Sequence, residues 1–145
     1  MDILLPIYLM FFGMSYHTDP YYSNIENASP YHTIIIFEVM PLENKGFIIG
    51  EFTNSYRVSS KILAATFRQK LYNGNDFSIE SKQVIGVSDG YDEDRFSKNG
   101  FSIIGWAGYG IKHKDLGLNL AAAPSLSYDS KLVYVFILTF SLRIN

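Results

Sequence analysis

The sequence has no cysteine among its 145 residues, and its formal net charge is only −2. The missing thiols exclude disulfides and thiolate metal sites. Basic residues gather compactly only at Lys112-His113-Lys114, so we expect no nucleic acid as a partner. No spacing typical of metal ligands, no glycine-rich phosphate loop and no nucleophile elbow is present, and we therefore expect neither a metal nor a cofactor.

Long apolar runs are also missing. A transmembrane helix needs about 18–20 continuous apolar residues, and no stretch of this chain reaches that length. The longest apolar stretch, Ile3–Met14, is interrupted by Pro6 and Gly13. It lacks the form of a signal peptide, because Asp2 stands where positive charge is expected and no small-residue cleavage site follows. We expect this stretch to be a first strand, with any export signal either removed or absent.

Aromatic residues are abundant, with 11 Tyr and 11 Phe beside 11 Gly. This composition is typical of all-β proteins, since aromatic side chains favour pleated surfaces. Runs with strand features alternate with turn signals, and no helical period is convincing. The predicted strands are Ile3–Met14, Tyr31–Met40, Phe47–Thr53, Lys61–Leu71, Phe77–Val87, Phe101–Tyr109, Leu116–Ala123 and Leu132–Arg143. We predict an all-β fold, a single domain over residues 1–145 that forms an eight-stranded antiparallel up-and-down β-barrel.

Apolar residues recur at every second position in the last two predicted strands. They are Leu116, Leu118, Leu120, Leu138, Phe140 and Leu142. Such alternation indicates that each strand has one apolar face, which in a membrane barrel faces the lipid. Two segments, Ile34–Phe37 and Phe47–Ile49, are nearly apolar on both faces. We therefore expect an outer-membrane type of barrel with an apolar interior pocket, rather than a water-filled channel.

In an up-and-down barrel, successive connections lie at alternate ends, so their order in the chain assigns each connection to one end. The two longest connections, Ser15–Ser29 and Ser88–Gly100, fall at one end, and the connections at the other end are short. Outer-membrane barrels show this asymmetry between external loops and periplasmic turns. His17 and the pair Asn54-Ser55 both fall at the long-loop end, so we expect their side chains to be able to meet.

A histidine and a serine at one rim suggest acyl transfer. The imidazole of His17 could accept a hydroxyl proton, and the hydroxyl of Ser55 could attack an ester or bind beside the developing oxyanion. The plainer alternative is a structural histidine among tyrosines and an ordinary turn serine. The acidic run Asp89–Asp94 could bind a divalent cation, but a solvated loop face is favoured. We expect a solvated surface position for His113 and a minor role for His32.

Three prolines, Pro6, Pro30 and Pro124, lie within or at the ends of predicted strands. Each removes a donor from the hydrogen-bond ladder, so in a closed barrel they are expected where strands part. A parted seam would admit an acyl chain from the bilayer. The alternative is that the prolines lie harmlessly at strand ends.

Together these motifs resemble the PagP-like outer-membrane lipid A palmitoyltransferases. The resemblance covers most of the chain after the first predicted strand. It rests on the order of Tyr16-His17, Pro30, Gly46-Phe47, Phe52-Thr53-Asn54-Ser55-Tyr56, Gly105-Trp106-Ala107-Gly108-Tyr109-Gly110, Pro124 and Val133-Tyr134-Val135-Phe136. It implies a barrel with a detergent-like acyl pocket, located in the outer membrane of a Gram-negative-type cell. It also implies transfer of a palmitoyl chain from a phospholipid to lipid A, the membrane anchor of lipopolysaccharide, with a monomer as the working unit.

By position, His17 matches the histidine of that family and Ser55 matches its serine. The resemblance thus implies His17 as general base, Ser55 as nucleophile or transition-state donor, and Asn54 as their orienting partner. Asn54 stands where the family has aspartate, and an amide cannot ionise. The amphipathic helix that begins the family's proteins is missing, and the chain ends in Arg143-Ile144-Asn145 rather than an aromatic residue.

Two other functions compete with an enzyme. A non-catalytic outer-membrane barrel with a structural or surface-interaction role is favoured by Asn54. A soluble lipocalin-like lipid carrier would use the same strands around a hydrophobic cup. The carrier predicts polar outward faces, whereas the membrane barrel predicts apolar ones.

Overall fold

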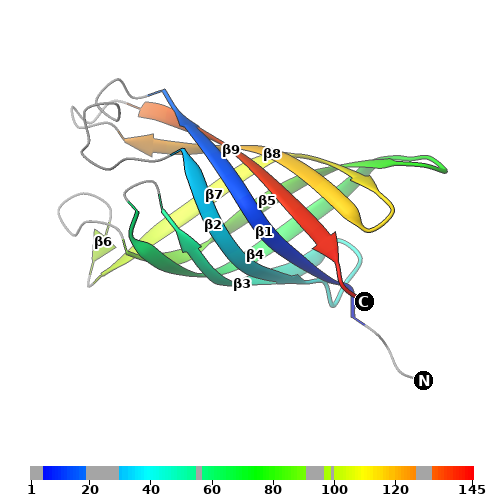
Figure 1. Cartoon of the computed structure of the whole chain (residues 1–145), viewed down its shortest axis with the longest axis horizontal. Coiled ribbons are helices and arrows are strands. Elements are labelled where there is room, and N and C mark those ends of the chain that lie inside the picture. Colours follow the sequence, from blue (N-terminus) through cyan, green and yellow to red (C-terminus); the bar gives the residue numbers. More distant parts are fainter. Residues whose placement is uncertain (1–4, 19–29, 55–56, 91–96, 99, 127–131) are drawn as a thin grey trace.

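The computed structural model describes residues 5–18, 30–54, 57–90, 97–98, 100–126 and 132–145. Every regular element in these ranges is a strand (Figure 1). The strands are β1 (Ile7–His17), β2 (Tyr31–Val39), β3 (Lys45–Thr53), β4 (Ser59–Asn73), β5 (Ser78–Asp89), β6 (Ser97–Lys98), β7 (Phe101–His113), β8 (Leu116–Leu126) and β9 (Leu132–Arg143).

The sheet closes into a barrel. Its order is β5-β4-β3-β2-β1-β9-β8-β7, and β5 also pairs with β7. Every pairing is antiparallel, and β6 is a two-residue addition on the edge of β7. The eight long strands therefore confirm the predicted up-and-down barrel. Figure 1 shows the strands tilted around the barrel and both chain ends at one end of it.

Strand boundaries differ from the prediction mainly at the first strand. β1 runs Ile7–His17 instead of Ile3–Met14, so His17 is the last residue of a strand and not part of a loop. At the end near the termini the connections are short, as predicted. The turn between β7 and β8 consists of Lys114 and Asp115, and Lys114 has a φ of 53°, which permits so tight a reversal.

A bulge in β1 decides which side chains enter the barrel. The register of β1 against both neighbouring strands shifts between Met10 and Phe12. Met10 is buried inside, whereas Phe11 and Phe12 are both exposed. After the shift, Ser15 is buried. Strict alternation from Met10 would have directed Ser15 outward, so the bulge creates the polar cluster described below.

The outer surface is apolar along most strands. Exposed large apolar side chains include Ile35, Ile49, Leu63, Ile85, Ile103, Tyr109, Leu116, Leu118, Leu120, Phe136 and Phe140. The predicted outward faces of β8 and β9 are therefore confirmed for Leu116, Leu118, Leu120 and Phe140. A soluble carrier would carry polar groups there, so the carrier's expectation is not met.

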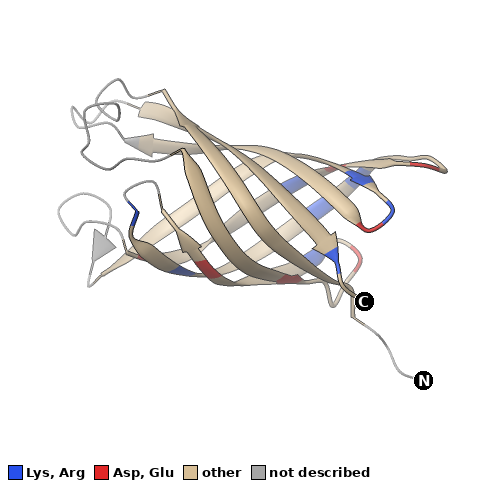
Figure 2. Ribbon diagram, in the orientation of Figure 1, with Lys and Arg blue, Asp and Glu red and all other residues tan. Residues whose placement is uncertain are grey.

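The middle of the barrel is packed. An apolar cluster fills it, consisting of Met10, Ile34, Ile36, Ile48, Ile62, Ala64 and Val84, with Phe52, Ile104 and Trp106 packed against it. Of the small residues expected to leave room in β4, Ala64 and Thr66 are buried but Ala65 is exposed. The interior is thus apolar at mid-height, as expected, and side chains occupy it there. A pocket that could hold an acyl chain stays a prediction. The charged positions of the strands lie mostly toward the end near the termini, where most of the coloured bands in Figure 2 are found.

Two of the three prolines lie at strand ends. Pro6 precedes β1 and Pro30 precedes β2, and their carbonyls accept hydrogen bonds from Met40 and Ser15. These two prolines do not interrupt a strand, in agreement with the alternative that the prolines lie harmlessly at strand ends.

Pro124 differs, because it lies inside β8. The ladder from β8 to β9 runs on past Pro124, which pairs with Tyr134. The ladder from β8 to β7 ends at Ala122, which pairs with Ala107. The strands β7 and β8 therefore part beside Pro124, so the predicted parting of strands is found at this proline but not at Pro6 or Pro30.

Candidate functional site

An inward-facing polar cluster lies at the end of the barrel away from the termini. Oγ of Ser15, on β1, lies 2.7 Å from Nε2 of His32, on β2, and 3.4 Å from Nε2 of His17. Ser15 is 9% exposed and His32 is 8% exposed. The two strands bring these residues together because His32 pairs with Gly13, two positions before Ser15 on the same face. One hydroxyl is thus flanked by two imidazoles inside the barrel.

The backbone fixes the orientation of His32. Its Nδ1 lies 2.8 Å from the carbonyl oxygen of Thr53 on β3. A carbonyl only accepts hydrogen bonds, so Nδ1 is the donor and the neutral ring presents the Nε2 lone pair to Ser15. The Ser15 hydroxyl donates to that lone pair. This is the geometry in which an imidazole can take a hydroxyl proton during acyl transfer.

The side chain of Asn54 is hydrogen-bonded to the surrounding turn. It is 2% exposed, and its Oδ1 accepts a hydrogen bond from the Val58 amide at 3.0 Å. Its Nδ2 donates to Oγ of Ser60 at 3.2 Å and to the carbonyl of Gly90 at 2.9 Å. These bonds fasten the β3–β4 turn to the end of β5. An aspartate could not donate to Gly90, so the amide fits this position better than the family's carboxylate would.

The structure places two of the three predicted residues at one end of the barrel and does not test their roles. His17 ends β1 and Asn54 follows β3, so both lie at the predicted end of the barrel. Ser55 lies outside the described residues. The catalytic set His17, Asn54 and Ser55 therefore stays a prediction.

Sequence reasoning missed Ser15 and His32 as partners. The period-two spacing of Ser15 and His17 was the available signal for a shared face. Whether that face points into the barrel depends on the bulge at Phe11, and no sequence pattern predicted this bulge. His32 was expected to have a minor role, yet it holds the centre of the cluster.

A second polar group, which we call the ion network, lies inside the barrel near the termini. The carboxylate of Glu38, which is 0% exposed, accepts hydrogen bonds from Thr66 at 2.8 Å, from Nε of Arg68 at 3.0 Å and from Lys82 at 2.7 Å. Such a buried carboxylate requires this many donors, because burying an unpaired charge is costly.

Glu80 extends the ion network toward the mouth of the barrel. Its carboxylate lies 3.0 Å from Nη1 of Arg68 and 2.9 Å from Nζ of Lys112. Both cations stack on Tyr8, with Cζ of Arg68 4.4 Å and Nζ of Lys112 4.2 Å from the ring centroid. A hollow of about 920 Å³ at this end is lined by these residues and by the turn 41–45. The interior of the barrel, which was expected to be apolar, is therefore charged at this end.

The turn at this mouth also carries an exposed ion pair. Nζ of Lys70 lies 2.9 Å from Oε1 of Glu43. The hydrogen bond from Lys70 holds the pKa of the Glu43 carboxyl below its ordinary value. Because both side chains are largely exposed, the pair contributes little to stability.

Over the described residues, no group of three histidines or carboxylates could hold a metal ion. Of the acidic run Asp89–Asp94, the structure describes Asp89, and Asp92, Glu93 and Asp94 lie outside the described residues. In the same ranges no helix is long and apolar enough to cross a membrane.

Comparisons with known proteins support the fold alone. No family model matches the chain, and no curated protein matches it by sequence. Among solved structures, the chain is similar to the N-terminal β-barrel domain of Pseudomonas aeruginosa OprF, with a TM-score of 0.54 and 7% sequence identity. The similarity covers 96% of this chain and 97% of that domain. No comparison supports the palmitoyltransferase resemblance beyond the barrel, so the chain has the fold of a small outer-membrane barrel domain.

Proposed function

We propose that this chain is a small, non-catalytic outer-membrane β-barrel with a structural or surface-interaction role. The observation that carries the proposal is the filled interior. The apolar cluster occupies mid-height, and the ion network occupies the end near the termini. At these two levels the side chains occupy the space that an acyl chain or a solute would need.

The outer surface supports insertion into a membrane. Ile103 is 82% exposed, and Leu63 and Ile85 are 55% and 58% exposed. Soluble monomers rarely leave a contiguous apolar surface of this extent in water. A closed barrel satisfies its backbone hydrogen bonds internally, as a lipid environment requires. The short turns at the end that holds both termini match periplasmic turns of outer-membrane barrels.

Expression with an outer-membrane export signal tests this function. We expect the protein in the outer-membrane fraction, with gel mobility that changes on heating, and with the mass of lipid A in the host unchanged. Recovery as a soluble protein without detergent would reject the membrane barrel. An acyl chain added to lipid A on expression would reject the non-catalytic role and favour the second candidate.

The second candidate is acyl transfer from a glycerophospholipid to lipid A. The hydrogen bond between Ser15 and His32 favours it, since it supplies an oriented base beside a hydroxyl. The parting of β7 from β8 beside Pro124 favours it too, as a lateral entrance for an acyl chain. In this function His17 is the general base, Asn54 orients it and Ser55 is the nucleophile or transition-state donor, and Ser15 with His32 offers a second hydroxyl–imidazole pair.

Lipid A analysis of cells expressing single variants separates the two pairs. If His17 and Ser55 act, His17→Ala and Ser55→Ala abolish the added chain while Ser15→Ala keeps it. If Ser15 and His32 act, Ser15→Ala and His32→Ala abolish it while Ser55→Ala keeps it. An added chain that survives all four substitutions would reject both assignments.

A further inference from the structure

A row of alternating charge crosses three strands on the outer face of the barrel. Glu51 on β3 is directly paired with Lys61 on β4, and both side chains are exposed. On β5, Oδ1 of Asp89 accepts a hydrogen bond from the Lys61 amide at 2.5 Å. The outward row therefore reads negative, positive, negative. It lies near the end of the barrel away from the termini.

An apolar row lies immediately below the charged row, toward the middle of the barrel. Ile49, Leu63 and Val87 form it, and Leu63 pairs with both of the others. They are two residues from Glu51, Lys61 and Asp89 along their strands, a separation of roughly 7 Å. Charge therefore lies toward the rim, and hydrocarbon-like surface lies toward mid-height.

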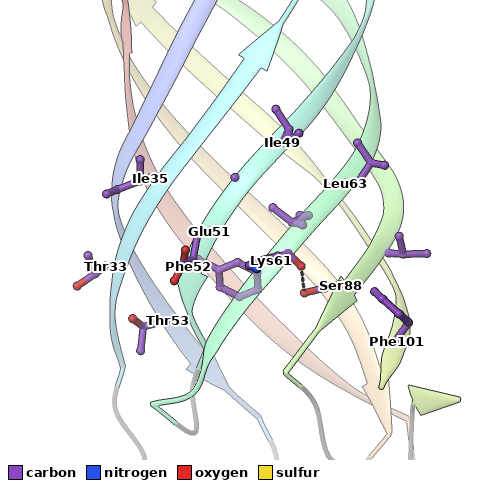
Figure 3. Close-up of a pocket in the computed structure, with 13 residues that line it drawn as sticks. Thr33, Ile35, Ile49, Glu51, Phe52, Thr53, Lys61, Leu63, Ser88 and Phe101 are labelled. Atoms are coloured by element: carbon purple, nitrogen blue, oxygen red, sulfur yellow. Dashed lines mark hydrogen bonds between the residues drawn. The ribbon is translucent and has the colours of Figure 1, made fainter. Parts of the chain in front are cut away.

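The two rows meet in a groove of about 670 Å³ (Figure 3). Side chains on its rim side are Thr33, Glu51, Thr53 and Lys61, and those on its apolar side include Ile35, Ile49, Leu63 and Val87. In Figure 3 the labelled side chains come from neighbouring strands, with Glu51 and Lys61 nearer the loop end than Ile49 and Leu63. The groove thus has the polarity of a single phospholipid, with headgroup toward the rim and acyl chain toward the middle.

We infer that this groove binds a zwitterionic phospholipid whose headgroup carries a primary ammonium, such as phosphatidylethanolamine. The inference rests on the membrane insertion proposed above. Lys61 pairs with the lipid phosphate, and Glu51 accepts hydrogen bonds from the ammonium. An acyl chain lies against Ile49 and Leu63.

The charges of the row select this headgroup. In the charged row, the carboxylates of Glu51 and Asp89 flank the ammonium of Lys61, so the row has a net negative charge. It would therefore repel a lipid that is itself negatively charged. A choline headgroup has no N–H and could not donate to Glu51. Glu51 accepts one hydrogen bond from Oγ of Ser59 through Oε1. A carboxylate has about four acceptor positions, so Glu51 retains capacity for an ammonium.

Native mass spectrometry of the full chain, extracted in detergent and stripped of lipid, tests the inference. The probes are phosphatidylethanolamine, phosphatidylcholine and phosphatidylglycerol with identical acyl chains. We expect the ethanolamine lipid to bind about fivefold more tightly than the other two, the upper range for exposed ion pairs. Glu51→Gln and Lys61→Gln remove most of this preference. Glu43→Gln and Lys70→Gln, an exposed pair at the opposite end, leave it unchanged.

Equal binding of the three lipids, stronger binding of phosphatidylglycerol, or an undiminished preference in Glu51→Gln would overturn the inference. Should a variant fail to fold, as judged by heat-dependent mobility, the comparison of lipids on the wild type decides alone. A protein that inserts but shows no headgroup preference refutes only the lipid site. A protein that needs no detergent refutes the membrane barrel itself.

Discussion

Oγ of Ser15 and Nε2 of His32 lie 2.7 Å apart inside the barrel, in a hydrogen bond that joins β1 to β2. Because both residues are buried, the loss of the hydroxyl leaves an imidazole nitrogen without this partner. We expect Ser15→Ala to lower the free energy of unfolding by about 1–3 kcal/mol. Urea unfolding in detergent, followed through the single tryptophan, measures it. Ser81→Ala, on the outer face of β5, is the control and should change little. A Ser15→Ala protein as stable as wild type would contradict the buried bond.

Removing the charge of Glu38 should be far more damaging than removing that of Glu43. Glu38→Gln leaves Arg68 and Lys82 buried beside a neutral group, which costs about 3–5 kcal/mol. Glu43→Gln breaks an exposed pair with Lys70 that solvent screens, so it should leave the free energy of unfolding almost unchanged. The same urea titration compares the two. Equal losses would show that the ion network is not buried as described.

Placing an aspartate at position 54, as in the palmitoyltransferases that the sequence resembles, should destabilise the protein. In Asn54→Asp the donor to Ser60 and Gly90 is lost, and a carboxylate oxygen then faces the Gly90 carbonyl. We expect a loss of about 1–3 kcal/mol in the free energy of unfolding. Asn44→Asp, in an exposed turn, is the matched control. A gain in stability with Asn54→Asp, or the appearance of lipid A acylation, would instead favour the enzymatic role.

Gly86 is required for the close approach of β5 to β4. A Cβ at this position would lie 2.3 Å from the carbonyl oxygen of Leu63 and 2.4 Å from Cα of Ala64. Backbone atoms cannot rotate away, so Gly86→Ala should destabilise the barrel by about 1–3 kcal/mol. At Gly105 the nearest atom, the Val84 carbonyl oxygen, lies at 3.3 Å. Gly105→Ala should therefore be tolerated much better, and similar thermal stability of the two variants would contradict this view.

The cost of placing a charge on the outer face shows whether lipid or water surrounds the barrel. Ile85 faces outward near the middle of β5, and Leu132 faces outward as the first residue of β9. In a membrane, Ile85→Arg should cost about 2–4 kcal/mol and Leu132→Arg about 0–1 kcal/mol. Refolding into lipid vesicles, followed by urea unfolding, gives both values. If Ile85→Arg proves neutral and improves solubility without detergent, the barrel is not a membrane protein.

The strands could be predicted from the sequence because their signals are local. Alternation in Leu116, Leu118 and Leu120 indicated an outward apolar face, and the structure confirms it. Parity of the strands then placed His17 and Asn54 at one end of the barrel. Each inference needed only residues that are neighbours in the chain or a count of strands.

The interior could not be predicted in the same way. Glu38, Arg68, Glu80, Lys82 and Lys112 lie on four different strands, and their charges become a network only when the barrel closes. The apolar pocket was expected from segments that are apolar on both faces, and such a pattern does not reveal how far side chains fill the space they surround.

The sequence by itself determined that the chain forms eight antiparallel strands with an apolar outer face, since period-two patterning and turn residues act locally. Tertiary structure alone decided what lies inside. The bulge beside Phe11 turned Ser15 inward, where closure of the barrel brought it to His32. A one-residue shift reverses the direction of every later side chain in a strand, and that shift is set by pairing with the neighbouring strands rather than by the residues of β1.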